Sequence, residues 1–384
     1  MPDASRYARR LAQARPELFQ AALAALEQPF DAAAMRAYLA QQKAGDEDAL
    51  KRILRRLRQQ VMLRVLLRDL SGRAPLAEVV TCMSNLAELS LGYALTHLSV
   101  WLEAQHGTPM ANGNRQELIV VGMGKLGGRE LNVSSDIDLI FVYPEEGETV
   151  SGAAAGAGAG PRLLSNHEYF TRLGRKLINA LADVTEDGQV FRVDMRLRPN
   201  GDSGPLVCSF DALENYFVAE GREWERYAWI KARVVATSSN ASVAAGAASG
   251  DPGVVAASGS VATDGGDLAQ ALGAVARPFV FRKYLDFGAF AAMRSLHAQI
   301  RAEVTRRDLA GHIKLGPGGI REIEFIAQAF QLIRGGRDAE LQLRPTLEVL
   351  AILQKKDLLP AQAVAELRAA YDFLRRLEHR LQYL

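Results

Sequence analysis

The sequence predicts an α+β fold, with a mixed β-sheet core flanked by an N-terminal helical region and a C-terminal helical bundle. Three observations lead to this prediction. Apolar residues recur at helical spacing from residue 16 to about residue 106, and again after residue 270. Between these regions, short β-rich apolar runs alternate with glycine turns and one helical stretch. At 384 residues, the chain is long enough for two or three structural units.

Composition narrows the class of protein. The chain has 46 basic and 44 acidic residues and a net charge of +2, which does not indicate a generally basic nucleic-acid-binding protein. Cys82 and Cys208 lie far apart, without the spacing of a metal site or a disulfide framework. The N-terminus carries charges where a signal peptide needs an apolar segment, and no apolar run is long enough to span a bilayer. We therefore expect a soluble, cytoplasmic protein with no membrane or nucleic-acid partner.

Residues 1–108 form the predicted N-terminal helical region. Within residues 51–70, apolar positions recur at helical spacing and Arg52, Arg55 and Arg58 occupy much of the remaining surface. These arginines could bind nucleic acid or could form a solvated helix face. We favour the solvated face, because aromatic stacking partners are absent. Gly107 is the expected end of the long helix that follows.

Residues 109–236 form the predicted α/β core. Strands are expected within 117–124, 136–143 and 189–199, each of which is a short apolar run. A helix is expected over 165–187, with Ser165 or Asn166 as its N-cap and Asp187-Gly188 as the turn into the third strand.

Two segments, about 147–161 and 237–269, are rich in Gly, Ala and Ser and nearly free of large apolar residues. They cannot bury enough surface to offset the entropy of ordering, so we predict flexible insertions. Residues 270–384 form the predicted C-terminal helical bundle. The final residues still have a mid-helix pattern without a stop signal, so we expect the chain to be a piece of a longer protein.

A pair of aspartates on the second strand is the most informative feature. Alternate side chains of a strand point the same way, so Asp136 and Asp138 project to one side. Two neighbouring carboxylates repel each other unless cations lie between them, and Mg²⁺ prefers such hard oxygen ligands. Asp194 on the third strand is the candidate third ligand. The sequence therefore predicts a magnesium site formed by these three catalytic carboxylates.

Other charged and small residues surround this pattern. Alternation on the third strand places Arg192, Arg196 and Arg198 on the same side as Asp194, where they could neutralise phosphate. A glycine-rich turn, GMGKLGG (122–128), follows the first strand and suggests a close approach of the backbone to a phosphate. It does not have the spacing of a Walker A loop.

The glycine turn, the paired aspartates and the later acid together resemble the nucleotidyltransferase superfamily. More specifically, the chain resembles the bifunctional glutamine synthetase adenylyltransferase/adenylyl-removing enzymes. Enzymes of this family have two catalytic domains, and the resemblance is to the N-terminal one, which is the adenylyl-removing domain. The resemblance covers nearly the whole chain outside the two insertions, and it rests on long motifs in the same order: GMGKLGGRELNVSSDIDLIF, RVDMRLRPNGDSGPLV, GREWERYAWIKARVV, RPFVFRKYLDF and IKLGPGGIREIEFIAQAFQLIRGGR.

This resemblance implies a reaction, in which orthophosphate attacks the AMP-tyrosine bond of adenylylated glutamine synthetase to give ADP and the unmodified enzyme. A PII-type signalling protein is an implied regulatory partner. Two alternatives remain open, namely a nucleotidyltransferase acting on another acceptor and a silent regulatory module that binds nucleotide or the PII-type protein.

Within the expected site, backbone amides at Gly127 and Gly128, with Ser135, are predicted to cradle phosphate. Lys125, Arg196 and Arg198 are further candidates for phosphate contacts, although structural salt bridges would explain them equally well.

Further motifs lead to weaker expectations. The KLGPGG segment (314–319) precedes a helix and could bind phosphate at the helix N-terminus or form a tight turn that docks the C-terminal helices. In residues 222–235, core packing is predicted for Trp224, Tyr227 and Trp229. In the same segment, positions partly near the cleft are predicted for Glu223, Arg226, Lys231 and Arg233. No role is expected for His97, His106, His167, His297, His312 and His379 beyond structure.

Overall fold

The computed structural model describes residues 5–151, 163–238, 265–283 and 311–383, with five isolated positions between the last two ranges. Most of the two predicted insertions lies outside the described residues, as does most of the helical pattern expected over 284–310. The described part is a mixed α+β structure, which confirms the predicted fold class.

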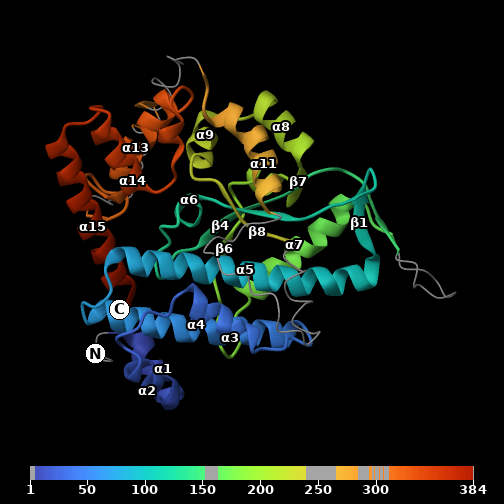
Figure 1. Ribbon diagram of the computed structural model, residues 1–384, viewed down its shortest axis with the longest axis horizontal. Helices are drawn as coiled ribbons and strands as arrows, with labels where there is room; N and C mark the ends of the chain where they lie inside the picture. The colour runs from blue at the N-terminus through green and yellow to red at the C-terminus, as the bar shows by residue number, and fades with distance from the viewer. Residues whose placement is uncertain are drawn as a thin grey trace, which may run out of the picture.

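Helices that pack against one another make up the N-terminal region (Figure 1). They are α1 (Arg6–Ala14), α2 (Pro16–Ala24), α3 (Ala32–Ala40), α4 (Glu47–Leu70) and α5 (Leu76–His106). Asp31 and Asp46 cap α3 and α4 by accepting backbone N–H groups of the first helical turn. Helix α5 ends at Gly107, whose φ of 82° suits glycine, as the sequence predicted.

Arg55 of α4 is buried rather than solvated, so the prediction of a solvated arginine face is wrong for this residue. Its guanidinium donates to the carbonyl oxygens of Ala180 at 2.9 Å and Gly188 at 2.7 Å. The last carbonyls of a helix lack partners within that helix, and a buried arginine with five N–H donors satisfies several of them at once. Arg52 is exposed, as expected.

A five-stranded sheet forms the centre of the molecule. Its strands are β3 (Ile119–Gly122), β4 (Ile137–Tyr143), β6 (Val193–Asp194), β7 (Val207–Ser209) and β8 (Arg233–Thr237). Strand β3 pairs antiparallel with both β4 and β8, while the other edge of β4 pairs in parallel with β6 near its start and with β7 near its end. The short helix α6 (Gly124–Gly127) occupies the connection from β3 to β4.

Alternate residues of the sheet enter two different cores. Leu139 and Phe141 of β4 pack into the large core formed with the N-terminal helices and α7 (Asn166–Ala182). Ile140 and Val142 enter a second core on the opposite face, beneath α8 (Phe210–Ala219), α9 (Glu223–Trp229) and α11 (Gly265–Val280). The sheet therefore lies between two helical layers (Figure 1).

A second, small sheet consists of β1 (Thr108–Ala111), β2 (Asn114–Arg115) and β5 (Glu148–Val150). Strand β5 lies within the predicted insertion 147–161, so that prediction is wrong for its first residues. The backbone of β5 pairs with β1, and its Thr149 amide donates to Leu164 O at 2.8 Å. The next helix, α7, begins at the predicted cap Ser165, whose hydroxyl accepts the Glu168 amide.

Two more expectations need correction in the second helical layer. Helix α11 begins at Gly265, inside the insertion predicted over 237–269. Trp229 is buried as predicted, but Trp224 is 40% exposed, because it lies at the start of the short helix α9. Helix amphipathicity explains the difference, since these two residues are five positions apart and lie on different faces.

The C-terminal region consists of α13 (Ile320–Arg334), the 3₁₀ helix η4 (Ala339–Gln342), α14 (Thr346–Lys355) and α15 (Ala361–Tyr383), which share a third core. Helix α15 extends beyond this core to the N-terminal helices, where the Tyr383 hydroxyl donates to Asp69 of α4 at 2.9 Å. None of the helices in the described ranges has the length and apolar character needed to cross a membrane.

His379 of α15 is buried and neutral. Its Nε2 lies 3.1 Å from Asn132 Oδ1, while Nδ1 has no hydrogen-bond partner among the described residues. Burial lowers the pKa of His379 to about 3, and the positive charges of Arg375, Lys125 and Arg380 act in the same direction.

We expect His379 to make folding stability depend on pH. Its pKa is lower in the folded state than in the unfolded state, so stability from this group is complete above about pH 6.5 and is lost as the pH falls toward about 3. Between pH 7 and pH 5, this one group should cost the folded state about 2 kcal/mol. The measurement is urea unfolding of the wild type and His379→Gln. The glutamine variant, which keeps a donor for Asn132, should lose less stability over this interval than the wild type or the exposed-histidine control His167→Gln. Equal pH dependence in all three proteins would contradict the assignment.

Candidate active site

Asp138 and Asp194 are direct neighbours across two parallel strands. The register of β4 and β6 pairs their Cα positions. Asp138 shares its side of β4 with Ile140 and Val142, and therefore projects onto the face covered by the second core. Asp136 lies just before β4 and is exposed. The structure thus brings Asp138 and Asp194 together, while Asp136 lies outside the strand pair, just before β4 begins.

The carboxyl group of Asp138 has a strongly shifted pKa. Burial raises its pKa to about 6, and the negative charges of Asp194 and Asp136 act in the same direction. The positive charges of Lys314 and Arg196 oppose this shift. A group with a pKa raised by a like-charged neighbour is typical of a functional site.

Arginines accompany the other two carboxylates. Arg192 forms an ion pair with Asp136 and also donates to Ser134 O at 2.8 Å. The Arg196 Nε donates to Asp194 Oδ2 at 2.9 Å, and this pairing lowers the pKa of Asp194. The Arg196 side chain is 73% exposed, so its guanidinium is accessible to an anion from solvent.

The predicted third strand is much shorter than 189–199, and this prediction needs correction. Pairing stops after Asp194, because its carboxylate accepts the Arg196 amide at 2.9 Å and the chain turns. Alternation therefore does not continue to Arg198, whose guanidinium turns back to Met195 O at 2.8 Å and to Asp202. Of the two interpretations of Arg198, the structural contact is the one observed.

The glycine turn packs tightly against the sheet. A Cβ on Gly127 would lie 1.9 Å from the carbonyl oxygen of Lys231, and Gly124 has a φ of +51° with Asp138 Oδ2 next to it. The amides of Gly127 and Gly128 donate to Met123 O and Gly124 O within the turn. In this conformation they are not free to donate to a phosphate, and close backbone packing explains the need for glycine.

The remaining predicted phosphate ligands lie on either side of this turn. Lys125 forms an ion pair with Glu378 of α15 at 3.3 Å, so the structural salt bridge is observed here too. Burial lowers the pKa of Lys125 to about 8, and the charges of Arg375 and Lys314 contribute. Ser135 is half-buried immediately before Asp136, and its amide donates to Asn132 O.

At the KLGPGG segment, the structure favours the tight turn over a phosphate site. The amides at the start of α13 already have partners, since Ile320 N donates to Ile313 O and Arg321 N donates to Lys314 O, each at 3.1 Å. Gly318 N donates to the Glu322 carboxylate at 2.9 Å. A helix N-terminus with satisfied amides has little capacity left for an anion.

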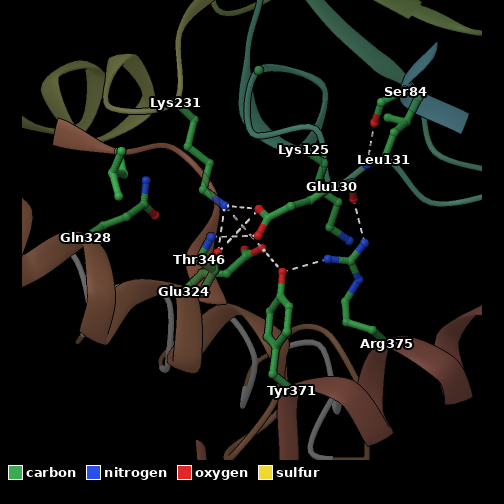
Figure 2. Close-up of polar contacts among 12 residues, drawn as sticks. Ser84, Lys125, Glu130, Leu131, Lys231, Glu324, Gln328, Thr346, Tyr371 and Arg375 are labelled. Atoms are coloured by element: carbon green, nitrogen blue, oxygen red, sulfur yellow. Dashed lines mark hydrogen bonds and ion pairs between the residues drawn. The ribbon is translucent and has the colours of Figure 1, made fainter. Parts of the chain in front are cut away.

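A buried polar cluster connects the segment after the glycine turn to the C-terminal helices (Figure 2). The Glu130 carboxylate accepts Lys231 Nζ at 2.6 Å and the Thr346 amide at 2.7 Å. Lys231 also lies 3.7 Å from Glu324. The polar cluster consists of Glu130, Asn132, Lys231, Glu324, Thr346, Tyr371 and Arg375.

Arg375 forms the second half of the polar cluster. Its Nε donates to Asn132 Oδ1 at 3.0 Å, and its guanidinium also bonds Glu130 O and, at 2.6 Å, the Tyr371 hydroxyl. Burial alone would lower the pKa of Lys231, but the negative charges of Glu130 and Glu324 have the larger combined effect, and the pKa of Lys231 is raised. The buried positive and negative groups of the cluster therefore stabilise one another in their charged forms.

Sequence reasoning missed this cluster. It placed Lys231, Arg226 and Arg233 partly near the cleft, whereas Lys231 and Arg226 are buried and Arg233 donates to carbonyls of the glycine turn. One signal was present in the sequence. Polar side chains recur every fourth residue on the buried face of α15, at Tyr371, Arg375 and His379.

The mixed sheet, the glycine turn and the paired carboxylates on β4 and β6 define a nucleotidyltransferase-type enzyme domain. Among the residues that the structure describes, no three His, Cys, Asp or Glu side chains are gathered closely enough to hold a metal ion. Asp136 and Asp194 are instead paired with arginines.

Comparison with known families identifies the group. The family model described as glutamate-ammonia ligase adenylyltransferase matches residues 3–248, and the model described as PII-uridylyltransferase matches residues 294–384. The chain belongs to the glutamate-ammonia ligase adenylyltransferase family.

Curated relatives agree with this assignment. Each is named bifunctional glutamine synthetase adenylyltransferase/adenylyl-removing enzyme. The protein of Aromatoleum aromaticum is 57% identical over 99% of this chain and 36% of its own length. Those of Ralstonia nicotianae and Chromobacterium violaceum are both 54% identical over 99% of this chain, and over 39% and 38% of their own lengths. The chain thus spans less than two fifths of the relatives that it matches.

We expect Gly127→Ala to destabilise the fold, because the new Cβ would overlap the Lys231 carbonyl oxygen, which is backbone and cannot rotate away. The expected loss is about 1–3 kcal/mol of unfolding free energy, measured by urea denaturation. Gly92→Ala is the matched control, since a Cβ there meets nothing within 4 Å in the middle of α5. The control should be unchanged or slightly more stable. A stable Gly127→Ala protein would show that the turn can relax.

Glu130→Ala should lower the unfolding free energy by about 3 kcal/mol, because it leaves the buried Lys231 charge with only the more distant Glu324. The exposed Glu348→Ala on α14 is the control and should change stability by less than about 0.5 kcal/mol. Adding Lys231→Met to Glu130→Ala should restore part of the loss, since no unpaired charge remains. Strictly additive losses in the double variant would argue against a coupled pair.

Proposed function

We propose that this chain removes AMP from adenylylated glutamine synthetase by metal-dependent phosphorolysis. The observation that carries the proposal is the pair of carboxylates at Asp138 and Asp194, placed side by side next to the glycine turn. The names of the relatives include both an adenylyltransferase and an adenylyl-removing activity. The removing activity is proposed here because the motifs of this chain resemble the N-terminal domain of that family.

The proposed reaction uses orthophosphate as the nucleophile. The bond between phosphorus and the tyrosyl oxygen breaks, a new P–O–P bond forms to give ADP, and the proton of hydrogen phosphate ends on the tyrosyl oxygen. Because phosphate is already an anion, the reaction needs alignment and charge neutralisation more than a general base. Arg192 and Arg196, both well exposed, are suited to neutralise phosphate oxygens.

We propose that the pair of carboxylates binds a magnesium ion, since Mg²⁺ is usually held by only one or two protein carboxylates together with water and substrate phosphates. Asp138 and Asp194 offer adjacent carboxylate oxygens, and the pKa of Asp138, raised by burial and by Asp194, reflects a repulsion that a cation relieves. Mg²⁺ bound there would supply the positive charge that stabilises the charge developing on the transferred phosphate. Asp136 can complete the ligand set once its carboxylate turns away from Arg192.

Glutamine synthetase is the proposed protein substrate, and a PII-type protein is a proposed regulator. The match of residues 294–384 to the PII-uridylyltransferase model supports a relationship between these C-terminal helices and PII-modifying enzymes. A nucleotidyltransferase that adenylylates an acceptor with ATP is the alternative, since the same carboxylates serve either direction of transfer.

The test is ADP release from adenylylated glutamine synthetase with Mg²⁺ and orthophosphate, with a parallel reaction that contains unmodified synthetase and ATP. We expect phosphate-dependent ADP from the wild type and a loss of at least about 100-fold in an Asp136→Asn, Asp138→Asn double variant. Asp211→Asn, an exposed aspartate at the start of α8, is the control and should keep wild-type activity. AMP incorporation without ADP release would favour the forward reaction and would falsify phosphorolysis.

A further inference from the structure

The segment that leads into the candidate site has no regular secondary structure of its own. Residues 131–136 lie between the short helix α6 and strand β4, and they form a turn flanked by irregular backbone. Such a segment lacks the repeating hydrogen bonds of a helix or a sheet, so contacts from other elements determine its conformation. The placement of Asp136, at its end, therefore depends on what holds this segment.

One face of α15 contacts the segment over two turns of the helix. Arg375 Nε donates to Asn132 Oδ1 at 3.0 Å, and His379 Nε2 lies 3.1 Å from the same oxygen. Three residues further along, Gln382 Oε1 accepts the Ser134 amide at 3.2 Å. Positions 375, 379 and 382 share one side of the helix, so α15 holds the segment at two points.

The end of α15 that carries Gln382 is itself anchored. The Tyr383 hydroxyl donates to the Asp69 carboxylate of α4 at 2.9 Å, and the Arg380 guanidinium donates to the Asp69 carbonyl oxygen at 2.7 Å. Gln382 lies between these two residues in the sequence. Its helical turn cannot move away from Ser134 without breaking the contacts with α4.

Ser134 connects this helix to the candidate site. Its carbonyl oxygen accepts the Arg192 guanidinium at 2.8 Å, and the same guanidinium is paired with Asp136. The carbonyl oxygen of Arg192 accepts the Ile137 amide at 2.9 Å, so residue 192 is attached here through both backbone and side chain. Direct contacts thus lead from Gln382 through Ser134 to Arg192.

The Ser134 carbonyl matters most when Asp136 turns toward a metal. Arg192 then loses its carboxylate partner and keeps the Ser134 carbonyl as its side-chain acceptor among the described residues. The Arg192 side chain is 54% exposed, and an exposed arginine loses rotamer freedom when it binds an anion. A fixed acceptor limits that cost by holding the guanidinium in one orientation beforehand.

We propose that Gln382 of α15 is a positioning residue, which holds Ser134 so that Arg192 stays oriented toward a phosphate group at the candidate site. The inference rests on the proposed function for the identity of the anion, which is orthophosphate or a phosphate of ADP. Gln382 does not contact this anion and acts through Arg192.

The test is a double-mutant cycle on phosphate binding. Isothermal titration of the 384-residue chain with orthophosphate and with ADP, each with Mg²⁺, would compare the wild type, Gln382→Met, Arg192→Ala and the double variant. Methionine keeps the length and helix propensity of glutamine but removes the oxygen acceptor. We expect Gln382→Met to weaken binding of one or both ligands about 5-fold and Arg192→Ala about 10-fold. The double variant should bind no more weakly than Arg192→Ala, because Gln382 acts through Arg192.

Two further variants serve as controls. Gln382→Glu keeps an oxygen acceptor for the Ser134 amide and should bind more tightly than Gln382→Met. Gln354→Met places the same substitution at an exposed position of α14 and should bind like the wild type. Loss for both ligands indicates that Arg192 binds the free phosphate and the ADP phosphate alike, and loss for one identifies which phosphate it binds.

Amide hydrogen exchange separates positioning from general damage. In Gln382→Met, exchange of the Ser134 amide should be about 10-fold faster, while the melting temperature stays close to that of the wild type. Equal ligand affinity in Gln382→Met and the wild type, a further loss when Gln382→Met is added to Arg192→Ala, or no binding of either ligand by the wild type would each overturn the proposal. A fall in melting temperature in parallel with the loss of binding would overturn it too. Gln382-dependent binding without ADP release from adenylylated synthetase would overturn the proposed reaction alone.

Discussion

The buried carboxylate of Glu130 is the constraint on which the arrangement of the site depends. Glu130 is 7% exposed, and its carboxylate accepts hydrogen bonds from Lys231, which lies just before strand β8, and from Thr346 at the start of α14. A buried ion pair contributes little net stability compared with apolar packing, but a buried charge without its partner is very costly. This interaction therefore favours one relative placement of the sheet and the C-terminal helices, because any other placement would leave a buried charge without its partner.

With this placement, segments that are far apart in the sequence together determine the geometry of the candidate site. The parallel register of β4 and β6 places the two carboxylates next to each other. Gly127 has no side chain, so the backbone of Lys231 can pack directly against the glycine turn. Arg375 of α15 then fixes Asn132, four residues before Asp136. Strand alternation, backbone packing and side-chain hydrogen bonds each determine one part of the geometry.

Local patterns allowed much of this structure to be predicted, and long-range contacts explain what was missed. Three predictions that depend only on residues near one another in the sequence were confirmed. They are the alternation of side chains along β4, the N-cap at Ser165 and the helix end at Gly107. The polar cluster was not predictable in this way, since Arg375 and Glu130 are separated by 245 positions. The third strand was predicted too long because the Asp194 side chain competes with the sheet for the Arg196 amide.

The charges around the carboxylates suggest why the site would attract phosphate only when loaded with metal. Asp136 and Asp194 are each paired with an arginine, Arg192 and Arg196, so the carboxylate of Asp138 is left without a cation partner in this set. A set of groups with an excess of negative charge does not attract a phosphate dianion. A divalent cation bound by Asp138 would reverse this excess and leave a net positive charge beside the exposed arginines. Metal binding and phosphate binding should therefore strengthen each other, as two ligands coupled through the same electrostatic field must.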